Sequence, residues 1–361
     1  MHLTNLSVIN FRNFRAFDYE ASPRINCFAG NNGVGKTNLL DAIHYLSFSK
    51  SFINTSDKLN ITHGEELFLI QGNYQRNDSH EVIYCGLKTG QKKVFKRNGK
   101  EYDKLSDHIG FIPLICLLPS DSNLIFSGSE IRRRFVDMVI AQFDHNYLND
   151  LIHYNRALEH RNKLLRDIDS TTSADSDNLE IWNEILAAKS LSIYRARKEF
   201  IEGFQESFRH YFEIISQGKE QVRLEYESQL MRNHPLEMLT RNLSRDKILG
   251  YTTSGIHRDN LSFEIDKHPL KNTSSQNQQK SYISALKFAQ FDFIKNKTAL
   301  EPILLLDDVF DKLDAERVKL IMNIVSGDSF GQIFITDTDE SRLKGMLKNL
   351  SIDNKILKIE I

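Results

Sequence analysis

Short apolar runs, separated by polar turn residues, recur through the first 120 residues of the chain and predict strands. β-branched and aromatic side chains supply most of the apolar positions. The predicted strands cover residues 3–11, 25–29, 67–74, 81–87 and 111–118. The pair Asn98-Gly99 is typical of a type I′ hairpin. We therefore expect a mixed sheet region with a single helix inserted after Ala29.

The apolar spacing changes from about Ser129 to Ser216, where it becomes three, four and seven residues. This period is that of an amphipathic helix. The apolar face consists of Trp182, Ile185, Leu186, Ile193, Tyr194, Phe200, Ile201, Phe204 and Phe208. A polar stretch at residues 170–177 divides the block into two arms. An antiparallel helical lobe is the economical interpretation.

Strand and turn signals return after Gln221, and the last third of the chain alternates between helix and strand. The expected order is a helix at 278–294, a strand at 302–306, a helix at 315–325 and a strand at 332–335. Such alternation indicates a parallel sheet. The predicted fold is α/β, with mixed and parallel sheets and flanking helices. Its two parts, residues 1–125 and 221–361, are expected to be separated by the helical lobe at 126–220.

The composition excludes several other classes of protein. A chain of 361 residues with 40% hydrophobic residues is long enough to bury a full core. Neither a signal peptide nor an apolar run near the roughly 20 residues of a membrane span is visible, so we expect a cytoplasmic protein without a membrane anchor. Cys27, Cys85 and Cys116 are too scattered for a disulfide framework or a zinc site. The net charge of -1 gives no global sign of nucleic-acid binding.

A phosphate-binding motif follows the second predicted strand. The pattern G-x-x-x-x-G-K-[ST] is matched by Gly30-Asn31-Asn32-Gly33-Val34-Gly35-Lys36-Thr37. Glycines in such a loop let backbone N–H groups close around phosphate oxygens at a helix N-terminus. Lys36 is expected to reach the β- and γ-phosphates, and the Thr37 hydroxyl to take one Mg²⁺ position. The motif therefore predicts binding of ATP with Mg²⁺.

A second motif, at Asp307-Asp308, ends the apolar run 303–306. An apolar strand ending in two carboxylates is common, but beside a phosphate loop it is the second element that an ATPase needs. Asp307 is expected to hold Mg²⁺, directly or through water. Asp308 is expected to orient or deprotonate the attacking water.

Two further segments resemble ABC-type P-loop ATPase heads. The run Asp311-Lys312-Leu313-Asp314 is similar to their D-loop, and Ser275-Gln276-Asn277-Gln278 is similar to their signature S-x-G-Q. In that family the signature docks on the γ-phosphate bound by the opposite subunit. The resemblance therefore implies that Ser275, Asn277, Gln278 and Asp314 help ATP to join two heads. Asn277 replaces a glycine; Asn best mimics the left-handed backbone of glycine, yet its bulk could weaken closure or slow hydrolysis.

Three assignments stay open at this level. Thr336 and Asp337 stand where many ABC-type ATPases have a switch histidine, so either residue senses the γ-phosphate or the segment caps a helix. Arg12 either touches phosphate or pairs with an acidic neighbour. The run 257–259 (His-Arg-Asp) either faces nucleotide or DNA, or forms a buried salt-bridged turn.

Local basic clusters are present in this near-neutral chain, and such runs are solvated faces by default. They comprise Arg132, Arg133 and Arg134; Lys92, Lys93, Lys96, Arg97 and Lys100; and Arg195, Arg197 and Lys198. The resemblance to DNA-binding heads implies a DNA-binding role for the cluster around the Asn98-Gly99 hairpin.

The whole chain resembles the RecF family of bacterial recombination mediators within the ABC-type heads. About 240 residues separate the phosphate loop from the signature, too many for a transporter motor and too few for the coiled coil of SMC or Rad50. The segments that carry the likeness are 6–14, 119–121, 128–137 and 253–259.

The resemblance implies an ATP-dependent homodimer that binds DNA at gaps and single-strand to double-strand junctions. It also implies slow, DNA-stimulated ATP hydrolysis, and loading of the recombinase RecA together with RecR and RecO at the nucleoid. Asp308 is one methylene shorter than the glutamate of fast motors, which fits slow hydrolysis. The alternatives are a transporter motor subunit and a scaffold switched by ATP without turnover.

Overall fold

The chain folds into two compact units. The computed structural model describes all residues except 168–172, 311–314, 328, 349–351 and 361. The first unit comprises Met1–Asp121, Ile214–Gln217 and Lys280–Ile361, and the second comprises Ser122–Glu213 and Gly218–Gln279.

Six strands of the first unit form an antiparallel sheet in the order β2-β1-β4-β5-β6-β7. Their bounds are His2–Phe11 (β1), Phe14–Glu20 (β2), Leu67–Arg76 (β4), Ser79–Lys88 (β5), Val94–Arg97 (β6) and Lys100–Glu101 (β7). Asn98 and Gly99, between β6 and β7, have φ values of 51° and 81°, as a type I′ turn requires. The sequence did not predict β2, whose exposed charged residues interrupt the apolar pattern and whose place is set by pairing with β1.

The second sheet of this unit is parallel and has the order β14-β3-β13-β12-β8. Its strands are Ile25–Ala29 (β3), Leu114–Leu117 (β8), Ile303–Asp307 (β12), Ile333–Asp337 (β13) and Asn354–Lys358 (β14). Every residue of β3 and β12 is buried, which explains why both read as continuous apolar runs rather than as alternating ones. Because parallel strands share one carboxyl edge, the segments that follow β3, β12 and β13 meet there.

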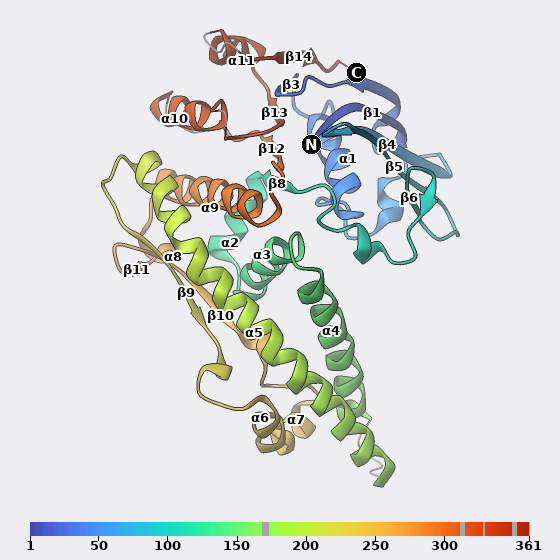
Figure 1. Ribbon diagram of the computed structural model, residues 1–361, viewed down its shortest axis with the longest axis vertical. Coiled ribbons are helices and arrows are strands. Elements are labelled where there is room, and N and C mark those ends of the chain that lie inside the picture. Colours follow the sequence, from blue (N-terminus) through green and yellow to red (C-terminus); the bar gives the residue numbers. More distant parts are fainter. Residues whose placement is uncertain (168–172, 311–314, 328, 349–351, 361) are drawn as a thin grey trace. The chain divides into compact units, whose positions relative to one another are not determined.

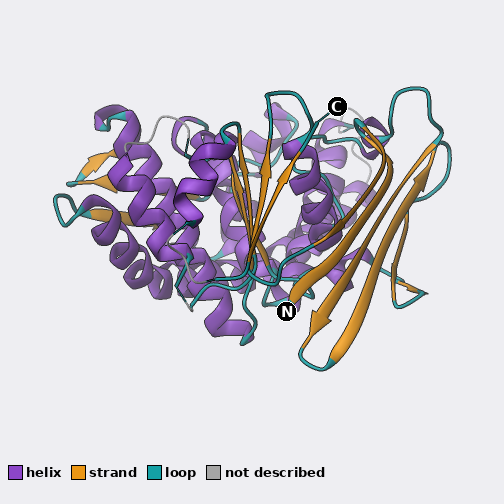
Figure 2. Cartoon of the chain, turned by 90° about the horizontal axis from the view of Figure 1, so that it is seen from above, coloured by secondary structure: helices purple, strands orange, loops and turns teal. Residues whose placement is uncertain are grey.

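Helix α1 (Lys36–Phe48) packs between the two sheets of the first unit (Figure 1). Figure 2 shows the two sheets from above, with helix between them. Leu39, Leu40, Ile43 and Leu46 are fully buried in one core with residues of both sheets. The remaining helices of this unit include α10 (Ala315–Val325), α11 (Glu340–Leu347) and most of α9 (Gln276–Thr298). The helix predicted after Ala29 is therefore confirmed, and it anchors the phosphate loop to the core.

The second unit contains the long helices that the apolar spacing predicted. Its helices are Asn123–Phe126 (α2), Ser129–Ala141 (α3), His145–Arg166 (α4), Ser173–Ser216 (α5, up to Glu213), Pro235–Arg241 (α6), Leu243–Leu249 (α7) and Leu270–Thr273 (α8). Helices α4 and α5 run in opposite directions, and Arg161 of α4 donates to Asn183 of α5 at 2.6 Å (Figure 1). The polar stretch separates the two arms only in part, because α5 already begins at Ser173.

Residues 218–279 group with this second unit, whereas the sequence prediction assigned 221–279 to the head. The physical reason is pairing: β9 (Val222–Glu227) and β10 (Asn260–Ile265) form a three-stranded sheet with β11 (His268–Pro269), and α3 packs against β10. Strand signals in the sequence do not reveal which sheet a strand joins.

A buried ionic network lies inside the second unit. Arg197 contacts Asp137 at 2.9 Å and Asp259 at 3.0 Å, and Tyr226 donates to Asp259 at 2.5 Å. His257, in the same turn as Asp259, contacts the Tyr154 hydroxyl at 2.7 Å. The segment 257–259 is therefore the buried salt-bridged turn, the second of the two alternatives, with the side chain of Arg258 exposed.

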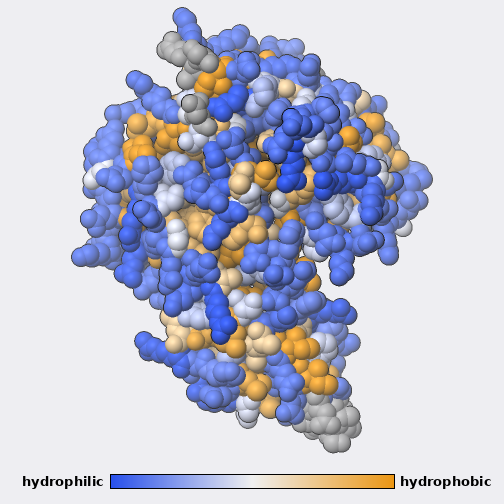
Figure 3. Space-filling model, viewed as in Figure 1, coloured by the Kyte–Doolittle hydropathy of each residue, from blue (hydrophilic) through white to orange (hydrophobic). Residues whose placement is uncertain are grey.

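The surface is mainly hydrophilic on the face that Figure 3 shows, with hydrophobic side chains in separate patches. No helix among the described residues combines the length and the apolarity needed to cross a lipid bilayer. Cys27, Cys85 and Cys116 are free thiols, and burial raises the pKa of Cys27 to about 12. Cys27 is therefore an unreactive core residue, as the sequence predicted.

Candidate functional site

The phosphate-binding motif forms the loop between β3 and α1 at the carboxyl edge of the parallel sheet. Gly30, Gly33 and Gly35 have φ values of 154°, 85° and 99°, a region that only glycine enters freely. A Cβ on Gly30 would lie 2.6 Å from the carbonyl oxygen of Ile359. At Gly33 a Cβ would meet no atom within 4 Å, so the backbone there is open to a ligand.

The Asp307 carboxylate lies at the end of β12 and connects the two predicted motifs. The Thr37 hydroxyl lies 2.9 Å from its Oδ1, and the Thr336 hydroxyl donates to the same oxygen at 2.7 Å. Burial raises the pKa of Asp307, and these two hydroxyl contacts act against that rise. Two oxygen-bearing side chains predicted to hold a metal ion, Thr37 and Asp307, are therefore in direct contact.

Asp308 follows with a φ of 49°, a left-handed value that is uncommon for a residue with a side chain. Its backbone N–H donates to the Thr336 hydroxyl at 3.0 Å. The Thr336 hydroxyl thus accepts a hydrogen bond from the Asp308 backbone and donates one to the Asp307 side chain. The left-handed turn directs the chain away from the sheet immediately after Asp307.

The side chain of Lys36 bonds back to the start of the phosphate loop. Its amino group donates to the carbonyl oxygens of Gly30 at 2.7 Å and Asn31 at 2.9 Å. Burial lowers the pKa of Lys36, while Asp308 and Asp307 raise it. The two carbonyl oxygens hold the ammonium at the loop, and the nearby carboxylates favour its charged form.

A cavity of about 180 Å³ collects these groups. It is lined by Asn32, Gly33, Gly35, Lys36, Thr37, Asn38, Asp307, Asp308 and Thr336. The other three motif residues, Gly30, Asn31 and Val34, line an adjacent cavity of about 380 Å³ with residues from the end of the chain. The structure therefore brings both sequence motifs together at one edge of one sheet.

Asp337 does not line the first cavity; it pairs with Arg342 at 2.5 Å. The cap of α11 is Asp339, whose carboxylate accepts from the N–H groups of Ser341 and Arg342. The helix-cap interpretation of the segment 336–338 is therefore wrong, and of the two open candidates it is Thr336 that lines the cavity.

Arg12 pairs with an acidic neighbour. Its guanidinium contacts Asp41 of α1 at 2.9 Å and the Ser51 hydroxyl at 3.0 Å, and the Asp41 side chain is fully buried. Arg12 does not line the cavity, so its phosphate role stays a prediction. Sequence reasoning missed its neighbour Asn13, which donates to the Val34 carbonyl at 3.1 Å and accepts from Asn38 at 2.6 Å.

The signature-like segment begins α9 with a reciprocal cap. The backbone N–H of Ser275 donates to the Gln278 side chain at 2.6 Å, and the backbone N–H of Gln278 donates to the Ser275 hydroxyl at 3.3 Å. Asn277 lies in the first turn of α9 and has no positive φ, so the expected left-handed backbone is not present there. A helical position explains why a residue with a side chain fits. Asp314 lies outside the described residues.

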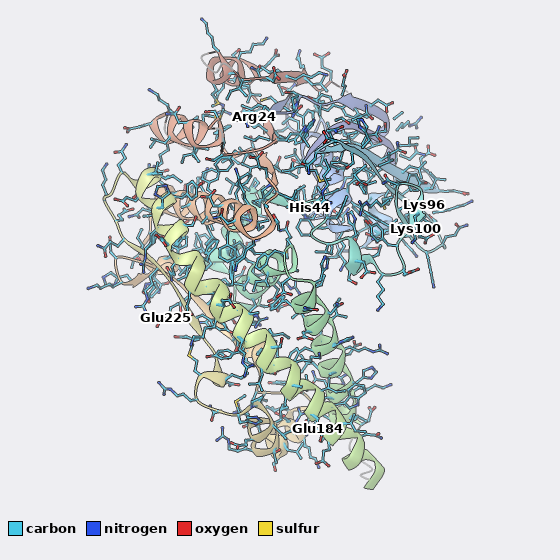
Figure 4. All side chains as sticks on the ribbon, viewed as in Figure 1. Arg24, His44, Lys96, Lys100, Glu184 and Glu225 are labelled. Carbon is cyan, nitrogen blue, oxygen red and sulfur yellow. The ribbon has the colours of Figure 1, made fainter. Side chains whose placement is uncertain are left out.

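Several cations of the basic clusters have polar partners. Lys93 contacts Asp57 at 2.8 Å, Arg97 contacts Glu81 at 2.9 Å, and the Arg133 side chain donates to the Asp259 carbonyl. In contrast, Lys92 and Lys100 are exposed. Figure 4 labels Lys96 and Lys100 on the β6–β7 hairpin.

Comparisons with known proteins show the family of this chain. A family model described as "RecF/RecN/SMC N terminal domain" matches residues 2–358. The DNA replication and repair protein RecF of Flavobacterium johnsoniae is 48% identical over 359 residues, covering 99% of this chain and 100% of that protein. RecF of Bacteroides fragilis is 48% identical over 361 residues, covering 100% of this chain and 97% of that protein.

Solved structures show the same fold. The structure described as "recombination mediator protein RecF-ATP in RecFOR pathway" has a TM-score of 0.88 at 30% identity, covering 99% of this chain and 95% of that one. An SMC head domain from Pyrococcus furiosus has a TM-score of 0.58 at 16% identity, covering 99% and 93%, and shares the fold alone. The fold is thus the ABC-type P-loop ATPase head, and the chain belongs to the RecF family of DNA replication and repair proteins.

Proposed function

We propose that this protein binds DNA as an ATP-dependent dimer, hydrolyses ATP slowly and helps to load the RecA recombinase together with RecO and RecR. The convergence of Lys36, Thr37 and Asp307 on one cavity beside the phosphate loop carries the proposal. The RecF relatives, described as DNA replication and repair proteins and as a mediator in the RecFOR pathway, support its DNA-related part.

The residues present fit ATP and Mg²⁺. The oxygen ligands are the Thr37 hydroxyl of α1 and the Asp307 carboxylate at the end of β12, the kind of ligand that Mg²⁺ prefers. The loop offers an open backbone at Gly33 and the ammonium of Lys36. Thr37 and Asp307 would hold the ion, which would neutralise charge on the phosphates. Gly30, Asn31, Asn32, Val34 and Gly35 would contribute the backbone that surrounds them.

Hydrolysis would depend on Asp308. Its carboxylate would orient or deprotonate the attacking water, and Thr336 would hold its backbone in the left-handed turn. The short Asp side chain would keep turnover slow, so that ATP acts as a timer for the dimer.

Dimer closure would use Ser275, Asn277 and Gln278, with Asp314 from the D-loop. The side chains of Ser275 and Asn277 are exposed at the start of a helix of 23 residues, where backbone N–H groups and the helix dipole attract an anion. Ser275 would face the γ-phosphate bound by a second copy. Lys96 and Lys100 on the β6–β7 hairpin, with Lys92 just before β6, would attract the DNA backbone.

The experiment is binding of the purified protein to a gapped duplex, with and without ATP and Mg²⁺. Two variants serve as controls: Lys36→Met, which removes the charge that meets the phosphates, and Ser275→Arg, which blocks the dimer interface while monomers still bind ATP. Tight DNA binding that requires ATP, Lys36 and Ser275 supports the proposal.

Other outcomes would favour the alternatives. Dimers that form with ATP but are indifferent to DNA and show no turnover would identify a scaffold. Co-purification with a membrane permease would identify a transporter motor. Unchanged ATP affinity in Lys36→Met would contradict the phosphate-loop assignment itself.

A further inference from the structure

We propose that Asn13 is a positioning residue that fixes the Val34–Gly35 peptide of the phosphate loop, so that the N–H of Gly35 points toward the bound phosphates. The inference rests on the proposed function, because it assumes that this loop binds the phosphates of ATP. It assigns a role to the turn between β1 and β2, which lies outside both sequence motifs.

The contact pattern of Asn13 is specific. Its amide N–H donates to the Val34 carbonyl oxygen at 3.1 Å, and its amide oxygen accepts from Asn38 at 2.6 Å. A Cβ on Gly35 would overlap the Asn13 amide group. Gly35 is therefore required for two reasons: its φ of 99° and the close approach of Asn13.

The geometry of a trans peptide makes this contact relevant to phosphate binding. The carbonyl and the N–H of one peptide plane point in opposite directions. When Asn13 holds the Val34 carbonyl on its side of the loop, the Gly35 N–H points to the opposite side, and Gly35 lines the cavity with Lys36 and Thr37. A phosphate loop that turned this peptide over would present a carbonyl oxygen to the anion.

The turn that carries Asn13 is itself held at two points of α1. Asn38 and Asp41 are three residues apart on this helix and therefore lie on one face. Asn38 contacts Asn13 at 2.6 Å, and Asp41 contacts the preceding residue, Arg12, at 2.9 Å. The backbone N–H of Arg12 also donates to the carbonyl of Asn60 at 2.8 Å, which ties the turn to the 3₁₀-helix Asp57–Asn60.

The left-handed backbone of Arg12 allows both contacts. Side chains of successive strand residues normally point to opposite faces. With a φ of 57° at Arg12, the alternation is broken, and both Arg12 and Asn13 reach the same helix. The Arg12–Asp41 pair thus fixes the turn on α1, and the fixed turn holds Asn13 where it binds the phosphate loop.

The test compares Asn13→Ala and Asn13→Asp with the wild type and with Asn10→Gly. Asn10 is a matched control: it is an Asn near the end of β1 with a φ of 51°, which Gly tolerates, and its side chain contacts Glu65. Each protein is titrated in the presence of Mg²⁺ with two ligands in separate experiments. One ligand is ATP and the other is inorganic tripolyphosphate. Thermal unfolding without ligand reports on the fold.

We expect Asn13→Ala to weaken both ligands by the same factor, about fivefold to tenfold, as loss of one ordering hydrogen bond implies. Asn13→Asp should be at least as weak, because a carboxylate cannot donate to the Val34 carbonyl and repels it. The unfolding temperature should stay unchanged because the Asn13 side chain is exposed. Asn10→Gly should bind both ligands as the wild type does.

If the wild type binds both ligands, any of three results would overturn this inference and leave the proposed function standing. These are unchanged affinity in Asn13→Ala, full affinity in Asn13→Asp, and a loss of affinity in Asn13→Ala for ATP but not for tripolyphosphate. The last would mean that Asn13 touches the nucleoside rather than shaping the loop. A wild-type protein that binds neither ligand would instead overturn the proposed function, and this inference with it.

Discussion

The hydroxyl of Thr336 donates to the Asp307 carboxylate at 2.7 Å, from the strand that neighbours β12. The two residues are paired in the register of the parallel sheet, so their contact is fixed by backbone hydrogen bonds. The same hydroxyl accepts the Asp308 backbone N–H at 3.0 Å. One side chain on β13 therefore aligns both residues of the Asp-Asp pair.

We expect Thr336→Val to slow ATP hydrolysis more than it weakens ATP binding. Valine keeps the shape but leaves the Asp308 N–H without its acceptor, a loss of about 1–3 kcal/mol, so turnover should fall about tenfold or more. Steady-state ATPase assays and equilibrium binding separate the two effects. Thr336→Ser, which keeps the hydroxyl, should behave as the wild type; a Val variant with normal turnover would show that the contact is not needed.

Asp308→Asn should retain ATP binding but lose turnover. Asn tolerates the left-handed φ of 49°, so the backbone should be preserved while the basic carboxylate is removed. Loss of a general base typically costs about 100-fold or more in rate. Single-turnover hydrolysis and ATP affinity are the measurements. An Asn variant that hydrolyses ATP at the wild-type rate would rule out a role for the Asp308 carboxylate.

Ser275→Asp can distinguish a helix cap from a nucleotide contact. Asp caps a helix about as well as Ser, so the start of α9 should remain stable. Its negative charge would repel a γ-phosphate offered by a second copy, so ATP-dependent dimerisation should be lost. Light scattering with and without ATP measures this. If the Asp variant forms dimers as the wild type does, Ser275 serves only as a cap.

Acid should destabilise the first unit through buried histidines. Burial lowers the pKa of His108 to about 4 from its ordinary value of 6.5, and the same holds for His44 of α1, which Figure 4 labels. Because the folded-state pKa lies below that of the unfolded chain, the unfolded chain takes up protons first as the pH falls. Stability is therefore fully present above about pH 6.5 and declines between about 6.5 and about 4.

His108→Gln tests this pH dependence. Gln does not titrate and can still donate to the Leu46 carbonyl, which His108 contacts at 2.7 Å. Between pH 7 and pH 5 the wild type should lose about 1–2 kcal/mol more unfolding free energy than the variant. Urea denaturation at both pH values measures the difference. Equal losses in the two proteins would exclude His108 as a source.

The sequence alone predicted the elements whose functional residues are neighbours in the chain. The phosphate loop was predictable because its glycines, Lys36 and Thr37 act together over eight neighbouring residues, and the flanking strand and helix follow from apolar spacing. The apolar run that ends at Asp307 was predictable because a strand buried on both faces reads as continuous. The signals for these elements lie within a few residues.

Tertiary structure decided which distant residues meet. Thr336 reaches Asp308 only through the register of two strands, Arg12 finds Asp41 only because α1 packs beside the β1–β2 turn, and Asn277 is helical because α9 begins before it. Strands β9 and β10 belong to the second unit because they pair with each other and α3 packs against β10. Apolar periodicity shows which face of an element is buried but not what covers it, so these partners were fixed only by packing and long-range pairing.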